Sequence, residues 1–124
     1  AQKAAVEALT GTQEPVRAMV REFARRRNYL VERLRSLPGV HCALPDGAFY
    51  AFPNISAAFG KRVGDREITN SQDFAELLLQ EAHVALVPGS AFGAEGYVRL
   101  SYATSMENLK RGMDRIAEFW SRLE

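Results

Sequence analysis

Apolar residues recur every three or four positions along several stretches of the chain, a pattern that predicts amphipathic helices. The longest stretch opens at Glu14-Pro15, where proline suits the first helical turn, and ends at Pro38-Gly39. The last stretch follows Thr104, which together with Glu107 fits a capping box. The predicted helices cover 1–9, 14–37, 69–82 and 104–123.

The start of the third helix and the segment before it are less regular. Thr69 and Gln72 fit a capping box there, and Ser71 is a competing cap. Residues 55–70 show no clear period, which predicts a long mobile connection with one helical turn around 57–59.

Short apolar or alternating runs predict four strands. Pro45-Asp46-Gly47 is a strong turn signal and joins the first two strands into a hairpin or near-hairpin. The third strand closes at Pro88-Gly89. This order of elements predicts an α+β fold, with a small three- to four-stranded sheet covered by helices. The predicted strands cover 40–44, 48–52, 84–87 and 97–102.

Arg99 is the unusual residue of the last predicted strand. Alternation places Val98, Leu100 and Tyr102 on one face of that strand and Arg99 on the other. A guanidinium among β-branched and aromatic residues needs a partner or water, and its planar fork suits a carboxylate or phosphate. The alternative is an edge strand from which Arg99 reaches water or a nearby glutamate.

Length, charge and cysteine content narrow the class of protein. At 124 residues the chain is one domain or a piece of a larger one, and it opens on Ala1 without a methionine, as expected of a segment from a longer protein. Its net charge of +1 favours neither nucleic acid nor an anionic membrane as a partner. The single cysteine, Cys42, excludes an internal disulfide and fits a reducing, cytoplasmic location.

The sequence shows no complete catalytic constellation and no metal-ligand pattern. Ser90 lies three residues before Gly93, whereas a serine nucleophile elbow needs glycine two residues on. His41 and His83 lie far apart and have no metal-like spacing with Cys42. The arginine run at 25–27 fits a solvated helix face with interspersed glutamates better than a nucleic-acid surface.

Two motifs follow one another at matching spacing along the chain. Residues 45–53 read PDGAFYAFP, and residues 87–93 read VPGSAFG before GYVRLSYA at 96–103. They resemble the P-x-G-A-F-Y-x-F-P hairpin and the V-P-G-x-x-F-G … G-x-x-R-x-S signature of fold-type I pyridoxal-phosphate-dependent aminotransferases. The helix that opens at Glu14 resembles the long helix that joins the two domains of these enzymes. The resemblance covers essentially the whole chain and is nearest to the bacterial aspartate aminotransferase branch of class I.

The resemblance implies a C-terminal small domain, with 1–13 as a helical segment from a missing large domain and 14–124 as the domain itself. It implies that Arg99 binds the α-carboxylate of an amino-acid or 2-oxo-acid substrate and that Phe49 lies near the substrate pocket. It also implies a homodimer when the enzyme is intact, and which amino acid is the substrate stays open.

The family's Schiff-base lysine belongs to the large domain. None of the lysines here, Lys3, Lys61 and Lys110, stands in the expected context. We therefore expect no catalytic and no cofactor-binding residue in these 124 residues, and pyridoxal 5'-phosphate only in the intact enzyme. The alternative is a stand-alone module that binds a small anion or regulates another protein and has kept this fold.

Overall fold

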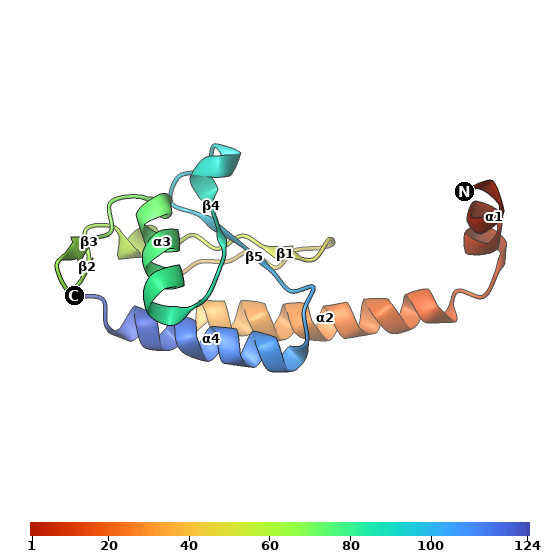
Figure 1. The fold of residues 1–124 in the computed structure, drawn as a ribbon. Coiled ribbons are helices and arrows are strands. Elements are labelled where there is room, and N and C mark those ends of the chain that lie inside the picture. The colour runs from red at the N-terminus through yellow and green to blue at the C-terminus, as the bar shows by residue number, and fades with distance from the viewer.

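The structure, a computed structural model, describes residues 1–124 and contains four α-helices, a three-stranded antiparallel sheet and a separate two-stranded hairpin (Figure 1). This mixed architecture confirms the predicted α+β class, with a small sheet covered by helices. The elements in chain order are α1 (Gln2–Thr10), α2 (Glu14–Arg35), β1 (Tyr50–Ala51), the 3-10 turn η1 (Ser56–Ala58), β2 (Arg62–Val63), β3 (Arg66–Glu67), α3 (Ser71–Ala82), β4 (Val87–Pro88), the 3-10 turn η2 (Gly89–Phe92), β5 (Val98–Ser101) and α4 (Met106–Ser121).

The strand β5 forms the centre of the main sheet, whose order is β1-β5-β4. Both neighbours are antiparallel to it, with Tyr50 opposite Ser101 in one pair and Val87 opposite Arg99 in the other. The edge-strand alternative for Arg99 is therefore wrong. A central position also fixes the register on both sides, so Arg99 is held in place by two ladders of hydrogen bonds.

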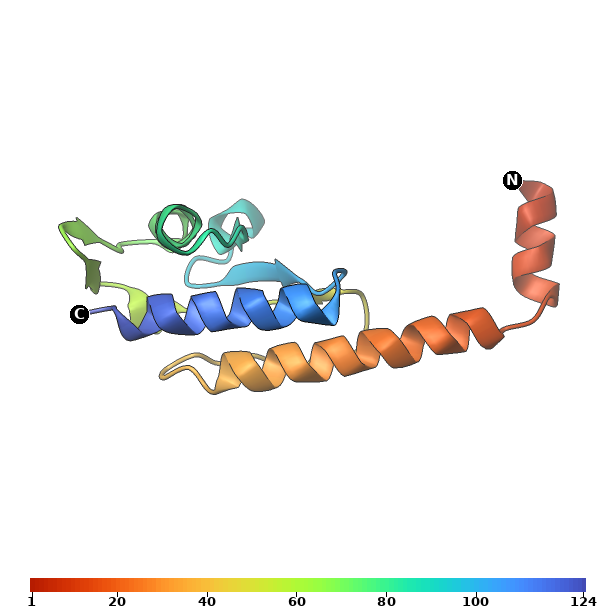
Figure 2. The ribbon, with the colours of Figure 1, turned by 60° about the horizontal axis from the view of Figure 1, so that its bottom comes forward.

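One face of β5 belongs to the hydrophobic core. Val98, Leu100 and Tyr102 are buried, as the alternation predicted, and they belong to a core cluster of 22 residues. α2 and α4 pack against each other, and α3 packs against α4 (Figure 2). Phe74 of α3 meets Phe119 and Trp120 of α4 at ring-centroid distances of 5.8 and 5.9 Å. Burying such a side chain stabilises the fold by about 1.5–3 kcal/mol.

The N-terminal part of the chain extends away from this core (Figures 1 and 2). α1 contains no buried residue, and the buried residues of α2 all lie in its C-terminal half. The apolar stripe predicted along the long helix is therefore covered only in part. Val16, Met19 and Val20 continue the stripe but remain exposed.

Two predictions about the middle of the chain are wrong in detail. The strand predicted at 40–44 contributes only an isolated bridge between His41 and Asn54, because β1 pairs with β5 instead of with this segment. The connection predicted at 55–70 contains η1, near the expected helical turn, and a β2–β3 hairpin that was not predicted. The backbones of Arg62 and Glu124 exchange hydrogen bonds, so the C-terminus joins this hairpin.

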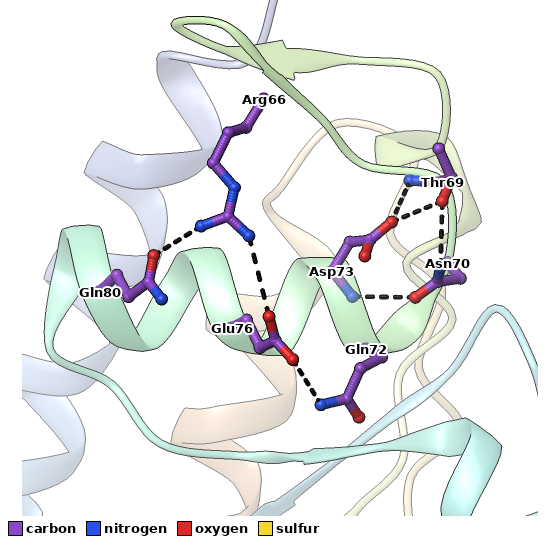
Figure 3. A network of polar contacts seen from close by, with 7 residues as sticks. All are labelled: Arg66, Thr69, Asn70, Gln72, Asp73, Glu76 and Gln80. Atoms are coloured by element: carbon purple, nitrogen blue, oxygen red, sulfur yellow. Dashed lines mark hydrogen bonds and ion pairs between the residues drawn. The ribbon is translucent and has the colours of Figure 1, made fainter.

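The start of α3 is capped one residue later than the predicted Thr69–Gln72 box (Figure 3). The Asn70 side chain accepts a hydrogen bond from the backbone N–H of Asp73 at 2.9 Å. The Asp73 carboxylate in turn accepts from the backbone N–H and the hydroxyl of Thr69. Asn70 and Asp73 therefore cap the helix in place of Thr69 and Gln72, the residues that the sequence pattern predicted. Nearby, Arg66 donates to Gln80 at 2.6 Å, which ties β3 to α3 (Figure 3).

Candidate functional site

Arg99 lies on the face of β5 opposite the core. Its guanidinium lies between two aromatic rings that come from the segments on either side of β5. Its guanidinium carbon is 4.3 Å from the ring centroid of Tyr50 and 4.7 Å from that of Phe92. Tyr50 belongs to β1 and Phe92 to η2, which follows β4, so the rings come from the two flanking sides of β5. Cation–π contacts of this kind contribute about 0.5–2 kcal/mol each, with the larger values where water is excluded.

The guanidinium of Arg99 is the only one in the chain that donates no hydrogen bond. No carboxylate lies within ion-pair distance of it either. The Nε atom is buried without a partner, and it is the only buried side-chain nitrogen or oxygen of which this is true. Every other arginine donates at least one hydrogen bond, namely Arg17, Arg21, Arg25, Arg26, Arg27, Arg33, Arg35, Arg62, Arg66, Arg111, Arg115 and Arg122.

An unpaired, partly buried guanidinium is unfavourable in a folded protein unless a ligand completes it. Because only Nε of Arg99 is buried without a partner, its two terminal nitrogens keep access to solvent and are free to donate. Two parallel N–H donors match the two oxygens of a carboxylate. The geometry of the Arg99 guanidinium is therefore suited to a small anion with two oxygens.

The loop that carries Phe92 approaches the backbone of Tyr97, the residue before β5, closely. The N–H of Gly89 donates to the carbonyl of Tyr97 at 2.8 Å, and the N–H of Ala94 donates to the carbonyl of Gly89 at 3.0 Å. Gly93 ends η2 with φ of 68°, a left-handed conformation that favours glycine. Glycines at these two positions let the chain reverse tightly enough to bring the Phe92 ring back over Arg99.

The same loop is anchored to the start of α3. The backbone N–H of Ser71 donates to the Glu95 carboxylate, and the N–H of Ser90 donates to the Ser71 hydroxyl at 3.1 Å. Ser71 is fully buried between these partners. The backbone N–H of Ser71, and then its hydroxyl, lower the pKa of the Glu95 carboxyl below its ordinary value of 4.5. The loop thus has a fixed attachment at each end of η2.

Phe49, the second site residue predicted from the sequence, lies beside this cluster without touching Arg99. Its ring is 4.6 Å from that of Tyr50 and 6.4 Å from that of Phe23 on α2. It lines a cavity of about 340 Å³ on the α2 side, together with Phe23 and Tyr102. The structure therefore connects Phe49 to Arg99 through one intervening ring, that of Tyr50.

Tyr50 and Phe92 are the residues of this cluster that the sequence analysis did not single out. A signal for Tyr50 was present, because residues opposite each other on paired strands share a face, and Tyr50 is opposite Ser101, two residues from Arg99. No local signal identifies Phe92, since its position depends on how the loop folds back. Phe52 and Tyr97 extend the aromatic surface and stack at 5.1 Å.

The remaining polar candidates lie elsewhere. Cys42 is buried, which raises the pKa of its thiol, and its thiol donates to the carbonyl of Ala43. His41 and His83 are exposed, and the chain contains no group of acidic, histidine and cysteine side chains arranged to hold a metal ion. None of the helices combines the length and the hydropathy that crossing a membrane requires.

Comparison with known proteins identifies the family of the chain. A curated aspartate/prephenate aminotransferase of Nitrosomonas europaea is 46% identical over 123 residues, which are 98% of this chain and 31% of that protein. An aspartate aminotransferase of Geobacillus stearothermophilus is 47% identical over 119 residues, 96% of this chain and 29% of that protein. The chain thus spans less than a third of the length of these relatives.

Solved structures share the fold as well as the sequence. The crystal structure of an aspartate aminotransferase from Rhizobium meliloti matches with a TM-score of 0.95 at 42% identity, over 99% of this chain and 31% of that one. An alanine aminotransferase from Pyrococcus furiosus matches with a TM-score of 0.81 at 32% identity, over 95% of this chain and 28% of that one. The family described as aminotransferase class I and II matches residues 1–116, and this chain belongs to that family.

Proposed function

We propose that this chain is the C-terminal small domain of a pyridoxal-phosphate-dependent aminotransferase of the aspartate/2-oxoglutarate type, in which Arg99 binds the α-carboxylate of the substrate. The observation that carries this proposal is the free guanidinium of Arg99, buried at Nε and without any partner in its own chain. Residues 14–124 form the domain, and residues 1–13 connect it to the rest of the enzyme.

Arg99 serves this reaction by orientation. Two parallel hydrogen bonds to one carboxylate fix the plane of the amino acid, whereas a single contact leaves it free to rotate. Transfer of an amino group requires one bond at the α-carbon to be held in a particular direction, so a grip at the neighbouring carboxylate is well placed to impose it. The rings of Tyr50 and Phe92 lie against the guanidinium that would make this contact.

Pyridoxal phosphate supplies the electron sink that this chemistry needs. The donors around Arg99 fit a substrate carboxylate beside that cofactor, but they do not fit the covalent attachment of the cofactor itself. No lysine lies on β1, η2 or β5, because Lys3 is on α1, Lys61 precedes β2 and Lys110 is on α4. We therefore infer that the attachment lysine lies outside these residues and that these 124 residues alone are inactive.

In the intact enzyme this domain closes over the substrate and carries Arg99 toward it, which also excludes water. Phe49 bounds the substrate pocket next to Tyr50. We infer a cytoplasmic homodimer for the intact enzyme, with the amino acid and the 2-oxo acid as its ligands. A stand-alone anion-binding module with the same fold is the alternative, which the free guanidinium alone also accommodates.

The test uses the full-length protein that contains this chain, with L-aspartate and 2-oxoglutarate as substrates. Arg99→Ala removes two charge-assisted hydrogen bonds, each of which contributes about 1.5–3 kcal/mol. We expect kcat/KM for L-aspartate to fall by about 10²- to 10⁴-fold, and by less in Arg99→Lys, which keeps the charge and loses the fork.

Arg111→Ala is the matched control, because Arg111 is exposed on α4 and donates only to Asn108 within the same helix. Its kcat/KM should stay within twofold of wild type. An Arg99→Ala enzyme with unchanged kinetics would refute the assignment. A separate spectroscopic test on the 124-residue chain mixed with pyridoxal phosphate should show no lysine-bound absorbance band. Appearance of that band would overturn the inferred inactivity.

A further inference from the structure

We propose that Phe92, together with Tyr50, is a positioning residue for Arg99, so that recognition of the substrate carboxylate depends on a ring in the 89–96 loop. This inference rests on the proposed role of Arg99. In this proposal the 89–96 loop fixes the plane and the position of the Arg99 guanidinium, which β5 alone does not fix.

The first observation is the pair of aromatic contacts. The ring centroids of Tyr50 and Phe92 lie 4.3 and 4.7 Å from the guanidinium carbon of Arg99, and they come from β1 and from η2, which follows β4. An arginine side chain has several rotatable bonds and loses considerable freedom when it is held in one geometry. Two rings that contact the guanidinium restrict that freedom before any ligand arrives.

The second observation is the burial of the Arg99 Nε atom without a partner. With Nε covered, the side of the guanidinium that includes Nε is closed to a ligand, and the two terminal nitrogens are the donors that remain. The surroundings of Arg99 therefore favour an end-on approach of the carboxylate. If the Phe92 ring is removed, the guanidinium loses one of the two rings that contact it and gains alternative orientations.

The third observation explains how Phe92 can position the guanidinium of Arg99 although its ring is half-exposed. Phe92 is 46% exposed, yet the loop around it is fixed at both ends. The N–H of Gly89 donates a hydrogen bond to the carbonyl of Tyr97. Ser71 accepts a hydrogen bond from the N–H of Ser90 through its hydroxyl and donates one to the Glu95 carboxylate through its backbone N–H. The ring of Phe52 meets that of Phe92 edge-on at 5.9 Å and supports it from the side.

The experiment compares two substrates in the full-length protein that contains this chain. One is L-aspartate, and the other is its analogue in which a carboxamide replaces the α-carboxylate. The ratio of their kcat/KM values isolates the contact between that carboxylate and Arg99. A change that merely loosens the fold lowers both values and leaves the ratio unchanged, so the ratio separates positioning from a structural effect.

The informative variant is Phe92→Leu, which keeps an apolar side chain and removes the π face. We expect it to lower the ratio by about 3- to 30-fold, the range of a cation–π contact, while Phe92→Tyr stays within about twofold of wild type. Leu79→Ala is the control, because Leu79 is an exposed apolar residue on α3, outside β1, β5 and the 89–96 loop. Its ratio should equal that of wild type.

An unchanged ratio in Phe92→Leu, or an equal loss in Phe92→Leu and Phe92→Tyr, would overturn the positioning role. Failure of the proposed function has a different signature, because Arg99→Ala would then leave the ratio at its wild-type value. A ratio that collapses in Arg99→Ala and persists in Phe92→Leu would keep the function and reject the role of the ring.

Discussion

Gly89 is the residue where a single methyl group should do most damage to the site. A Cβ atom there would lie 2.9 Å from the carbonyl carbon of Tyr97 and still closer to the carbonyl oxygens of Tyr97 and Ala94. All of these atoms belong to the backbone, so no side chain can rotate away to relieve the clash. The loop would have to move away from Tyr97, and the hydrogen bonds that join Gly89 to Tyr97 and to Ala94 would break or lengthen.

The expected loss of stability follows from the steric clash and the lost hydrogen bonds. Overpacking against fixed neighbours costs about 1–3 kcal/mol, and each lost backbone hydrogen bond adds about 0.5–1.5 kcal/mol. We expect Gly89→Ala to lower the free energy of unfolding by about 2–5 kcal/mol. Because Phe92 moves with the loop, the preference for L-aspartate over its carboxamide analogue should fall as well.

Urea denaturation of the 124-residue chain measures this loss of stability, with the fluorescence of Trp120, the single tryptophan of these residues, as the signal. Trp120 is buried against Phe74 and reports on the core. Gly112→Ala is the matched control, since nothing lies within 4 Å of a Cβ at that helical position, and it should stabilise the chain by about 0.5–1 kcal/mol. A Gly89→Ala chain within 0.5 kcal/mol of wild type would refute the argument, given about that level of experimental resolution.

Two further predictions concern the anchor between α3 and the loop. Asn70→Ala removes the N-cap of α3 and should lower the free energy of unfolding by about 0.5–2 kcal/mol, with Asn70→Ser close to wild type in the same urea titration. Glu95 has a lowered pKa in the folded chain, so its contribution to stability is present above pH 4.5, its ordinary value, and is lost as the pH falls below it. The stability difference between wild type and Glu95→Gln should therefore be constant near neutral pH and shrink in acid; a difference that does not change with pH would exclude the ionised Glu95 as an anchor.

The helices and the faces of β5 were predictable because both rest on local periodicity. The spacing of apolar residues located every long helix, and alternation placed Val98, Leu100 and Tyr102 in the core and Arg99 on the other face. The capping box at α3 was displaced by one residue, since Asn70 competes successfully with Thr69 for the same role. Boundaries of this kind depend on small differences between neighbouring polar side chains.

The pairing of strands and the surroundings of Arg99 required the three-dimensional structure. The turn at Pro45-Asp46-Gly47 favoured a local hairpin, but β1 pairs with the distant β5, and residues 40–44 keep only the His41 bridge. Whether Arg99 has a partner depends on every residue that folds near it, which no local pattern reveals. The contact with Phe92 arises only when the 89–96 loop closes on β5.

The central claim is that the unpaired guanidinium of Arg99 binds the α-carboxylate of an amino acid. The most direct test is the ratio of kcat/KM for L-aspartate to that for its α-carboxamide analogue, measured in the full-length wild-type and Arg99→Ala proteins. Wild type should prefer the carboxylate by about 10²- to 10⁴-fold, and Arg99→Ala should lose most of this preference. An equal preference in the two proteins would show that another group binds the carboxylate.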